Sequence, residues 1–175
     1  FIFLNHGGYN RGARPVANGL MWANRTVTFQ VNTNQRIMGG SIVPTITSTE
    51  FQDAITAAVA AWNNSCGTNF QVSVTGTTNN VMASGDYVNT IMWDDRTTAE
   101  GSYRQSTSSL AFASPNVSGD TLLDCDIVVN ADSGGTYGVN GAAGAYDMIG
   151  ILVHEIGHCL GLDHTAEQTG YTSSN

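Results

Sequence analysis

The most informative segment of this 175-residue chain reads His154-Glu155-Ile156-Gly157-His158-Cys159-Leu160-Gly161-Leu162-Asp163-His164. On an α-helix, residues four positions apart lie about 40° apart around the axis and about 6 Å along it. His154 and His158 can therefore direct both imidazoles at one metal ion. Glu155 lies about 100° further round the helix than His154, which places it beside the ion, in contact with a bound water, rather than among the ligands.

His164 can join the other two histidines only if the helix ends before it. In a continued helix it would lie roughly 9 Å beyond His158 along the axis, whereas a zinc–nitrogen bond is about 2.0–2.1 Å long. Gly161 resolves the conflict, because glycine readily adopts the left-handed conformation that ends helices. Three neutral imidazoles and an open fourth position are typical of catalytic rather than structural zinc. The segment therefore predicts one catalytic Zn²⁺ held by His154, His158 and His164.

The chemistry expected of such a site is hydrolysis of a peptide bond. Zinc lowers the pKa of its bound water toward ~7 and polarises a carbonyl group. Glu155 is predicted to accept the water's proton as general base and to pass it to the departing amine. A catalytically silent, zinc-stabilised binding or adhesion module is the alternative. Glu155 favours the enzyme, since folding around zinc needs only the three histidines.

The rest of the chain predicts two helices and a sheet in one domain. Helices are expected at 49–62, with Ser48 or Thr49 as N-cap, and at 147–160, which is apolar on nearly all sides and therefore buried. Strands are expected at 26–32, 70–74, 88–93, 109–113 and 126–130. Strand 109–113 ends before Pro115, which marks it as an edge strand. This order indicates a mixed sheet with two packed helices.

Composition and charge exclude several classes of function. The chain is 41% hydrophobic, as expected of a globular protein, and its formal charge of −8 disfavours binding to nucleic acid or anionic membranes. It has no apolar run of about 18 residues, so no membrane span is expected. Its uncharged polar residues are common in exported proteins, and we expect secretion.

The zinc motif resembles that of the metzincin metallopeptidases, and its surroundings resemble the matrixins. Thr165 follows the third histidine, residues 51–62 resemble the first helix of matrixin catalytic domains, and 146–165 resemble their active-site helix and turn. The resemblance covers roughly residues 20–165. It implies an α/β fold of the α+β type, with a mixed, mostly parallel twisted sheet, an antiparallel edge strand and two long helices, the second of which carries the zinc site.

The resemblance also implies where an extended protein or peptide substrate binds. Leu110, Ala111, Phe112 and Ala113 resemble the Leu-Ala-His-Ala strand that borders the matrixin substrate cleft. We expect these residues to bind the substrate as an added strand; an ordinary edge strand is the alternative. Phe112 replaces a histidine that binds a second, structural zinc in animal matrixins, so no such site is expected.

The chain departs from metzincins at its C-terminal end. Metzincins have a methionine-containing turn after the third histidine, but here no methionine follows Met148. We therefore expect residues 1–175 to form a single catalytic domain that is truncated before its C-terminal subdomain. A C-terminal fragment of the same protein and an inhibitory propeptide are the expected partners. Closure of the fold in another way and membership of another metzincin branch are the alternatives.

Acidic loops and cysteines leave further alternatives open. Six aspartates are candidate Ca²⁺ ligands or simply solvated carboxylates, namely Asp94, Asp95, Asp120, Asp124, Asp126 and Asp132. Cys159 lies about 100° round the predicted helix from His158 and points to the core. It is expected to be a buried thiol or to form a disulfide with Cys66 or Cys125, rather than to bind metal. His6 is expected to be a surface residue.

Overall fold

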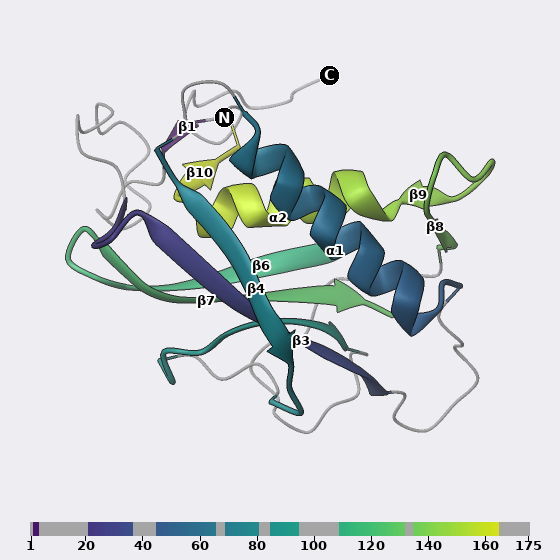
Figure 1. The fold of residues 1–175 in the computed structure, drawn as a ribbon, viewed down its shortest axis with the longest axis horizontal. Helices are drawn as coiled ribbons and strands as arrows, with labels where there is room; N and C mark the ends of the chain where they lie inside the picture. The colour runs from purple at the N-terminus through teal and green to yellow at the C-terminus, as the bar shows by residue number, and fades with distance from the viewer. Residues whose placement is uncertain are drawn as a thin grey trace, which may run out of the picture.

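The computed structural model describes residues 2–3, 21–36, 45–65, 69–80, 85–94, 109–131 and 135–164. Two helices, α1 (Ser48–Asn63) and α2 (Met148–Cys159), pack against each other on one face of a six-stranded sheet (Figure 1). No helix in the described ranges is long and apolar enough to cross a membrane. Both helices lie within a residue or two of their predicted positions.

The sheet is mostly parallel and has one antiparallel edge strand, as predicted. Its strands lie in the order β2 (Met21–Trp22), β7 (Thr121–Asn130), β5 (Asn89–Asp94), β3 (Thr26–Arg36) and β4 (Gln71–Thr77), and every neighbouring pair along this order is parallel. The sixth strand, β6 (Ala111–Ser118), pairs antiparallel with β7. Short pairings join β1 (Ile2–Phe3) to β10 (Leu162–Asp163) and β8 (Tyr137–Gly138) to β9 (Tyr146–Asp147).

The main core fills the space between the helices and the sheet. Its fully buried side chains come from the strands and from both helices, and include Phe29, Phe51, Ile55, Ile91, Ile127, Met148, Leu152 and Ile156. Each such side chain contributes about 1.5–3 kcal/mol through removal of apolar surface from water. Alternate strand residues face the other side of the sheet, where Met92, Val128 and Phe112 form a separate apolar contact. Phe112 thus packs in an apolar setting.

Strand β6 runs through Pro115, and the expectation that the strand ends before this residue is wrong. The hydrogen bond from the Asn130 N–H to the Leu110 carbonyl (2.9 Å) shows that, up to the register shift after Asn116, the even-numbered residues of β6 bond to β7. Pro115 is paired with Cys125 at a position where the backbone N–H faces away from β7. The missing N–H therefore costs no ladder bond, which is why proline is accepted in an edge strand.

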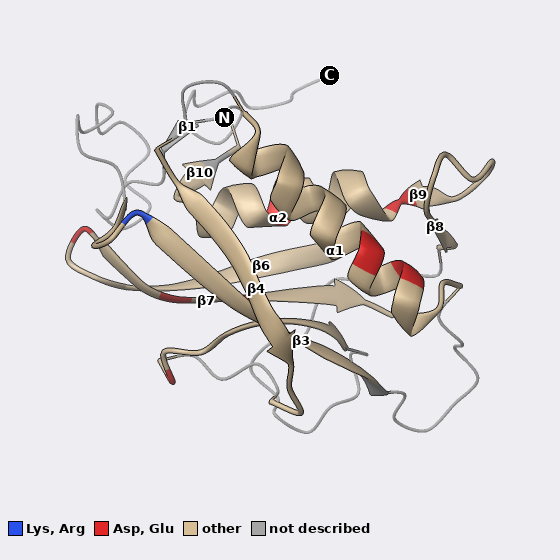
Figure 2. Cartoon of the chain, in the orientation of Figure 1, with Lys and Arg blue, Asp and Glu red and all other residues tan. Residues whose placement is uncertain are grey.

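Helix α1 begins one residue earlier than expected, and its cap is Thr47 rather than Ser48 or Thr49. The Glu50 N–H donates to the Thr47 hydroxyl oxygen (3.2 Å), and the Glu50 carboxylate accepts from the Thr47 N–H (2.7 Å). This reciprocal capping box satisfies two backbone donors at the helix start. Figure 2 shows acidic residues near the starts of both helices, where the helix dipole favours negative charge.

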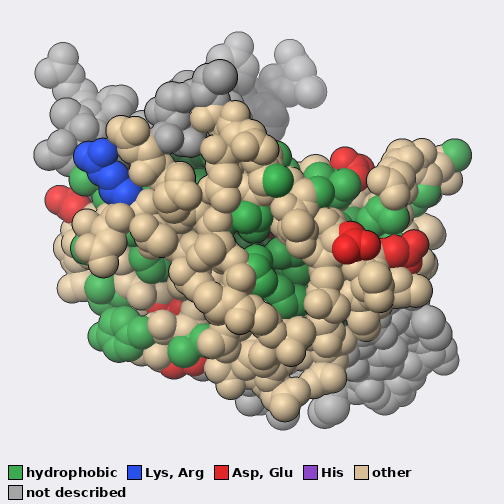
Figure 3. All heavy atoms as spheres, in the orientation of Figure 1, with side chains coloured by type: hydrophobic (Ala, Val, Ile, Leu, Met, Phe, Trp, Pro, Cys, Tyr) green, Lys and Arg blue, Asp and Glu red, His purple; other side chains and the backbone are tan. Residues whose placement is uncertain are grey.

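Apolar side chains reach the surface in separate groups on the face shown in Figure 3. The large apolar residues that are exposed within the described ranges are Met21, Val74, Tyr87 and Tyr146. They come from different strands and connections, as single exposed apolar residues commonly do in folded proteins.

The capping box provides a test of the α1 boundary. Thr47→Ala removes the hydroxyl acceptor, so it should lower the free energy of unfolding by about 1 kcal/mol in denaturant titration. Thr49→Ala is the matched control, because Thr49 is exposed within the helix, and it should change the value by less than about 0.5 kcal/mol. A larger loss from Thr49→Ala than from Thr47→Ala would contradict this cap.

Candidate metal centre

Helix α2 is held in place at its start and along its buried face. The Asp147 carboxylate caps it by accepting from the N–H groups of Ile149 (3.2 Å) and Gly150 (3.1 Å). The indole N–H of Trp62 in α1 donates to the carbonyl of Val153 (2.9 Å), immediately before His154. Because these contacts and the core fix the helix, they also fix the direction of the histidines it carries.

The three predicted ligands meet at one point. The Nε2 atom of His154 lies 2.8 Å from that of His164 and 3.0 Å from that of His158, and the last two are 3.2 Å apart. They are the one group of three or more potential ligand side chains found within the described part of the chain. His154 and His158 are half-buried, and His164 is exposed.

The turn after α2 delivers the third histidine. Gly161 has a φ of +89°, which glycine adopts at little cost, and its N–H donates to the carbonyl of His158 (2.9 Å). The following residues form β10, which pairs with β1. The prediction that the chain turns at Gly161 is confirmed. The pairing of β10 with β1, in contrast, is not indicated by any pattern in the sequence.

The hydrogen bonding of His158 suits a metal ligand. Its Nδ1 lies 2.7 Å from the carbonyl oxygen of Leu162. A carbonyl only accepts hydrogen bonds, so Nδ1 is the donor of this contact, and Nε2 is the nitrogen left to offer a lone pair to a metal at the shared point. Burial, together with the neighbouring rings of His158 and His164, lowers the pKa of His154. This shift also favours the neutral imidazole that binds metal.

The arrangement fits zinc. A tetrahedral ion with bonds of 2.0–2.1 Å separates its ligand atoms by about 3.3 Å, and the three Nε2 separations are slightly shorter. Three nitrogen ligands and one open position match the donor set of catalytic zinc. The histidines can therefore hold the ion with only small movements of their rings.

Glu155 is buried next to the three histidines, with 6% of its surface exposed. Burial raises the pKa of this carboxyl group to about 7, against a hydrogen bond from the Ala113 N–H and the charge of His164, which act in the opposite direction. The bond from Ala113 connects α2 to the edge strand β6. This contact between the acid and the strand was not anticipated from the sequence.

The predicted substrate-binding residues lie at the start of β6. Leu110 precedes the strand, and its carbonyl bonds inward to Asn130. Phe112 lies two residues after Leu110, so its backbone groups also face β7. The backbone groups of Ala111 and Ala113 face away from β7. The Ala113 N–H is used by Glu155. The structure thus brings this strand next to the acid, and substrate binding by it stays a prediction.

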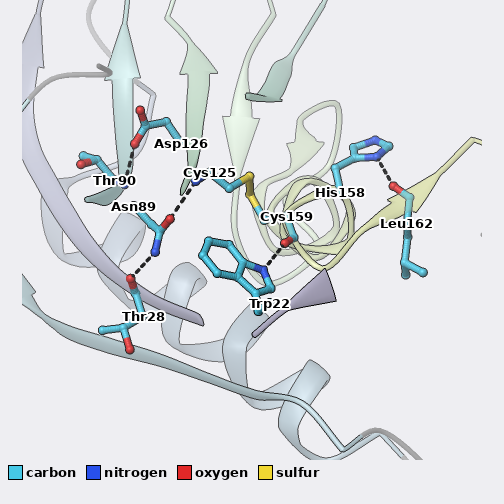
Figure 4. Close-up of a disulfide and its surroundings, with 9 residues drawn as sticks. All are labelled: Trp22, Thr28, Asn89, Thr90, Cys125, Asp126, His158, Cys159 and Leu162. Atoms are coloured by element: carbon cyan, nitrogen blue, oxygen red, sulfur yellow. Dashed lines mark hydrogen bonds between the residues drawn. A yellow bond between two sulfur atoms is a disulfide. The ribbon is translucent and has the colours of Figure 1, made fainter. Parts of the chain in front are cut away.

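Cys159 forms a disulfide with Cys125, one of the two partners left open by the sequence. Figure 4 shows the bond passing from the end of α2 to β7, with His158 on the other side of the helix. Both cysteines have no exposed surface. The prediction that Cys159 points into the core is confirmed. Cys66 lies outside the described residues, as do His6, Asp95, Asp132 and Thr165.

The acidic residues near β7 give no support for a calcium site. Asp126 accepts a hydrogen bond from the Thr90 N–H (2.7 Å), and Asp124 accepts one from the Gly85 N–H (2.8 Å). Within the described ranges, aspartates and glutamates form no group with the geometry of a metal site. These two buried carboxylates instead satisfy backbone donors of neighbouring segments.

A mostly parallel sheet, two packed helices and three convergent histidines beside a glutamate define a zinc metallopeptidase-type domain. The family model for the matrixins matches residues 21–171. Because this match covers most of the chain, the protein belongs to the matrixin family. No match was found among curated proteins.

Asp124 generates a prediction about pH. Burial raises the pKa of this carboxyl group, the Gly85 N–H opposes the rise, and the charge of Asp86 adds to it. Between the unfolded and folded pKa values the native state holds more protons, so stability falls as pH rises through that window. Asp124→Asn keeps an oxygen for Gly85 and removes the titration. The variant should therefore lose this part of the pH dependence.

The measurement is the free energy of unfolding by denaturant at a series of pH values above the ordinary pKa of aspartate. Asp120→Asn is the control, because Asp120 is exposed in the turn between β6 and β7. An Asp124→Asn profile with the same slope as that of the natural sequence would contradict the assignment.

Proposed function

We propose that this protein is a secreted zinc endopeptidase that cleaves extended protein substrates by attack of water on a peptide bond. The observation that carries the proposal is the meeting of the His154, His158 and His164 Nε2 atoms within 3.2 Å of one another, with Glu155 buried beside them. Zinc in this position would lower the pKa of a coordinated water and polarise the substrate carbonyl.

Glu155 is proposed as the general base. A pKa of about 7 allows its carboxylate to accept a proton and to release it again near neutral pH. The bond from the Ala113 N–H holds the carboxylate against the edge strand. After accepting the water's proton, the same group is placed to protonate the departing amine. No nucleophilic side chain is needed in this sequence of steps.

The edge strand is proposed to align the substrate. The Ala111 N–H and carbonyl and the Ala113 carbonyl lie on the side of β6 that faces away from β7. An extended peptide can add to this edge as a further strand, with main-chain hydrogen bonds that depend little on its side chains. Because Glu155 bonds to Ala113, a peptide bound there lies close to the proposed base.

The Cys125–Cys159 disulfide supports the proposal of secretion. Disulfides persist in oxidising surroundings outside the cell or in the compartments that lead there, and they are rare in the cytosol.

Glu155→Gln tests the proposed mechanism. The amide cannot act as a base, so kcat for cleavage of a peptide library should fall at least 10²-fold, while the zinc content per chain stays unchanged. Removal of zinc with a chelator should abolish cleavage, and added zinc should restore it. Cleavage that survives both treatments would contradict the mechanism. Failure of the natural protein to cleave any peptide while it binds zinc would favour a silent binding module.

The edge-strand proposal predicts a periodic effect of substrate methylation. In a strand pair, alternate N–H groups point to the partner, so N-methylation along a good peptide substrate should weaken binding at every second position. Loss of one hydrogen bond should raise KM roughly 2–10-fold. The intervening positions are the built-in control. An equal effect at all positions on the side of the peptide bound by β6 would contradict pairing with β6.

A further inference from the structure

We propose that the Cys125–Cys159 disulfide and Trp22 are positioning residues for the metal centre, beyond any general contribution to stability. They hold the last turn of α2 to the sheet, and this turn sets the positions of His158 and His164. The inference rests on the metal centre proposed above. It concerns how firmly the three histidines are kept in the geometry that an ion requires.

The disulfide acts on the residue next to a ligand. Cys159 is the last residue of α2 and follows His158 directly. Its partner, Cys125, lies in β7 between the strand's pairings with β2 and β5. The bond therefore ties the end of the helix to the interior of the sheet, while His158 projects from the other side of the helix (Figure 4).

Trp22 provides a second tether at the same residue. Its indole N–H donates to the carbonyl of Cys159 at 2.7 Å in a buried hydrogen bond. This carbonyl is one of the last four of the helix, which have no partner within the helix itself. Trp22 is also paired with Leu122 of β7, so both tethers lead to the same strand.

The sheet end of the disulfide is itself fixed. The Cys125 N–H donates to Oδ1 of Asn89 (2.7 Å), and Nδ2 of Asn89 donates to the carbonyl of Thr28 (2.9 Å). Figure 4 shows this series of contacts, which leads from β3 through Asn89 to Cys125 and on to Cys159. Cys125 is thus held by its neighbours and gives the helix a rigid point of attachment.

The anchored end of α2 determines the positions of two of the three ligands. Immediately after Cys159 the chain turns at Gly161, whose N–H bonds to the carbonyl of His158 (2.9 Å). The carbonyl of Leu162 accepts a hydrogen bond from Nδ1–H of His158 (2.7 Å), and His164 follows two residues later. A shift of the helix end would therefore alter the tilt of His158 and the approach of His164 together.

The burial of the Cys125–Cys159 disulfide indicates a permanent structural cross-link rather than a redox switch. Both cysteines have no exposed surface, and Trp22 is 9% exposed, so a reductant in solution has no access to the disulfide in the folded protein.

Disulfides also stabilise a fold by restricting the unfolded chain. That general effect would change the unfolding equilibrium but not the metal affinity of molecules that are folded.

The test measures metal affinity of folded protein. Co²⁺ is titrated into metal-free samples in competition with a chelator, well below the unfolding temperature of every variant, and its visible absorption reports ligand geometry. The double variant Cys125→Ala/Cys159→Ala should bind Co²⁺ about 10–100-fold more weakly than the natural sequence, the range found for groups that orient metal ligands. Its absorption spectrum should also change.

Trp22→Phe keeps an aromatic ring, although a smaller one, and the disulfide, but removes the indole N–H donor. It should weaken Co²⁺ binding in the same direction as the double variant and by a smaller factor. It also keeps the proposal testable if the double variant does not fold. Unchanged Co²⁺ affinity and an unchanged spectrum in Trp22→Phe and in any folded double variant would overturn the proposal.

Val72→Ala is the matched control for lost stability. Val72 is buried in β4, at the opposite edge of the sheet from the disulfide. This variant should unfold more easily yet bind Co²⁺ as the natural sequence does. An equal loss of affinity in Val72→Ala would show that stability alone is responsible. If the natural protein binds no Co²⁺ or Zn²⁺, the metal centre itself fails, which is a different result from normal binding by all variants.

Discussion

The site depends on one geometric constraint: three imidazole nitrogens must come within about 3.3 Å of one another to share an ion, and a single straight helix can supply only two of them. The chain satisfies this constraint by ending α2 at Cys159 and turning at Gly161, where φ is +89°. Nε2 of His164 then lies 2.8 Å and 3.2 Å from the other two nitrogens. The end of the helix is therefore as important to the site as the helix itself.

The same helix belongs to the hydrophobic core, which couples the chemistry to folding. Met148, Leu152 and Ile156 are fully buried on one side of α2, while the ligands project from the other. Glu155 lies between these environments, and its burial raises its pKa to about 7. Its hydrogen bond to Ala113 places the acid against the one antiparallel edge strand. A shift in core packing would therefore move the ligands and the acid as a unit.

Local patterns predicted the parts of the structure that depend on local geometry. The apolar spacing in 51–62 indicated α1, and the spacing of His154 and His158 indicated α2 and two ligands. The partner of Cys159 could not be predicted, because no local sequence pattern distinguishes Cys66 from Cys125. Only the folding of the sheet brings Cys125 close to Cys159. The two-residue strands and the contact of Trp22 with Cys159 likewise connect distant segments. The N-cap of α1 was expected at Ser48 or Thr49, one or two residues after the observed cap at Thr47, because the capping box that Thr47 forms with Glu50 was not recognised in the sequence.

The central claim is that His154, His158 and His164 together form an open zinc site. X-ray absorption spectroscopy of the zinc-loaded protein tests it most directly, alongside the same measurement on His164→Ala. The account predicts one zinc per chain, with three imidazole nitrogens at about 2.0–2.1 Å and one further oxygen. His164→Ala should lose one imidazole from this shell. A sulfur neighbour at about 2.3 Å, or an unchanged shell in His164→Ala, would contradict the account.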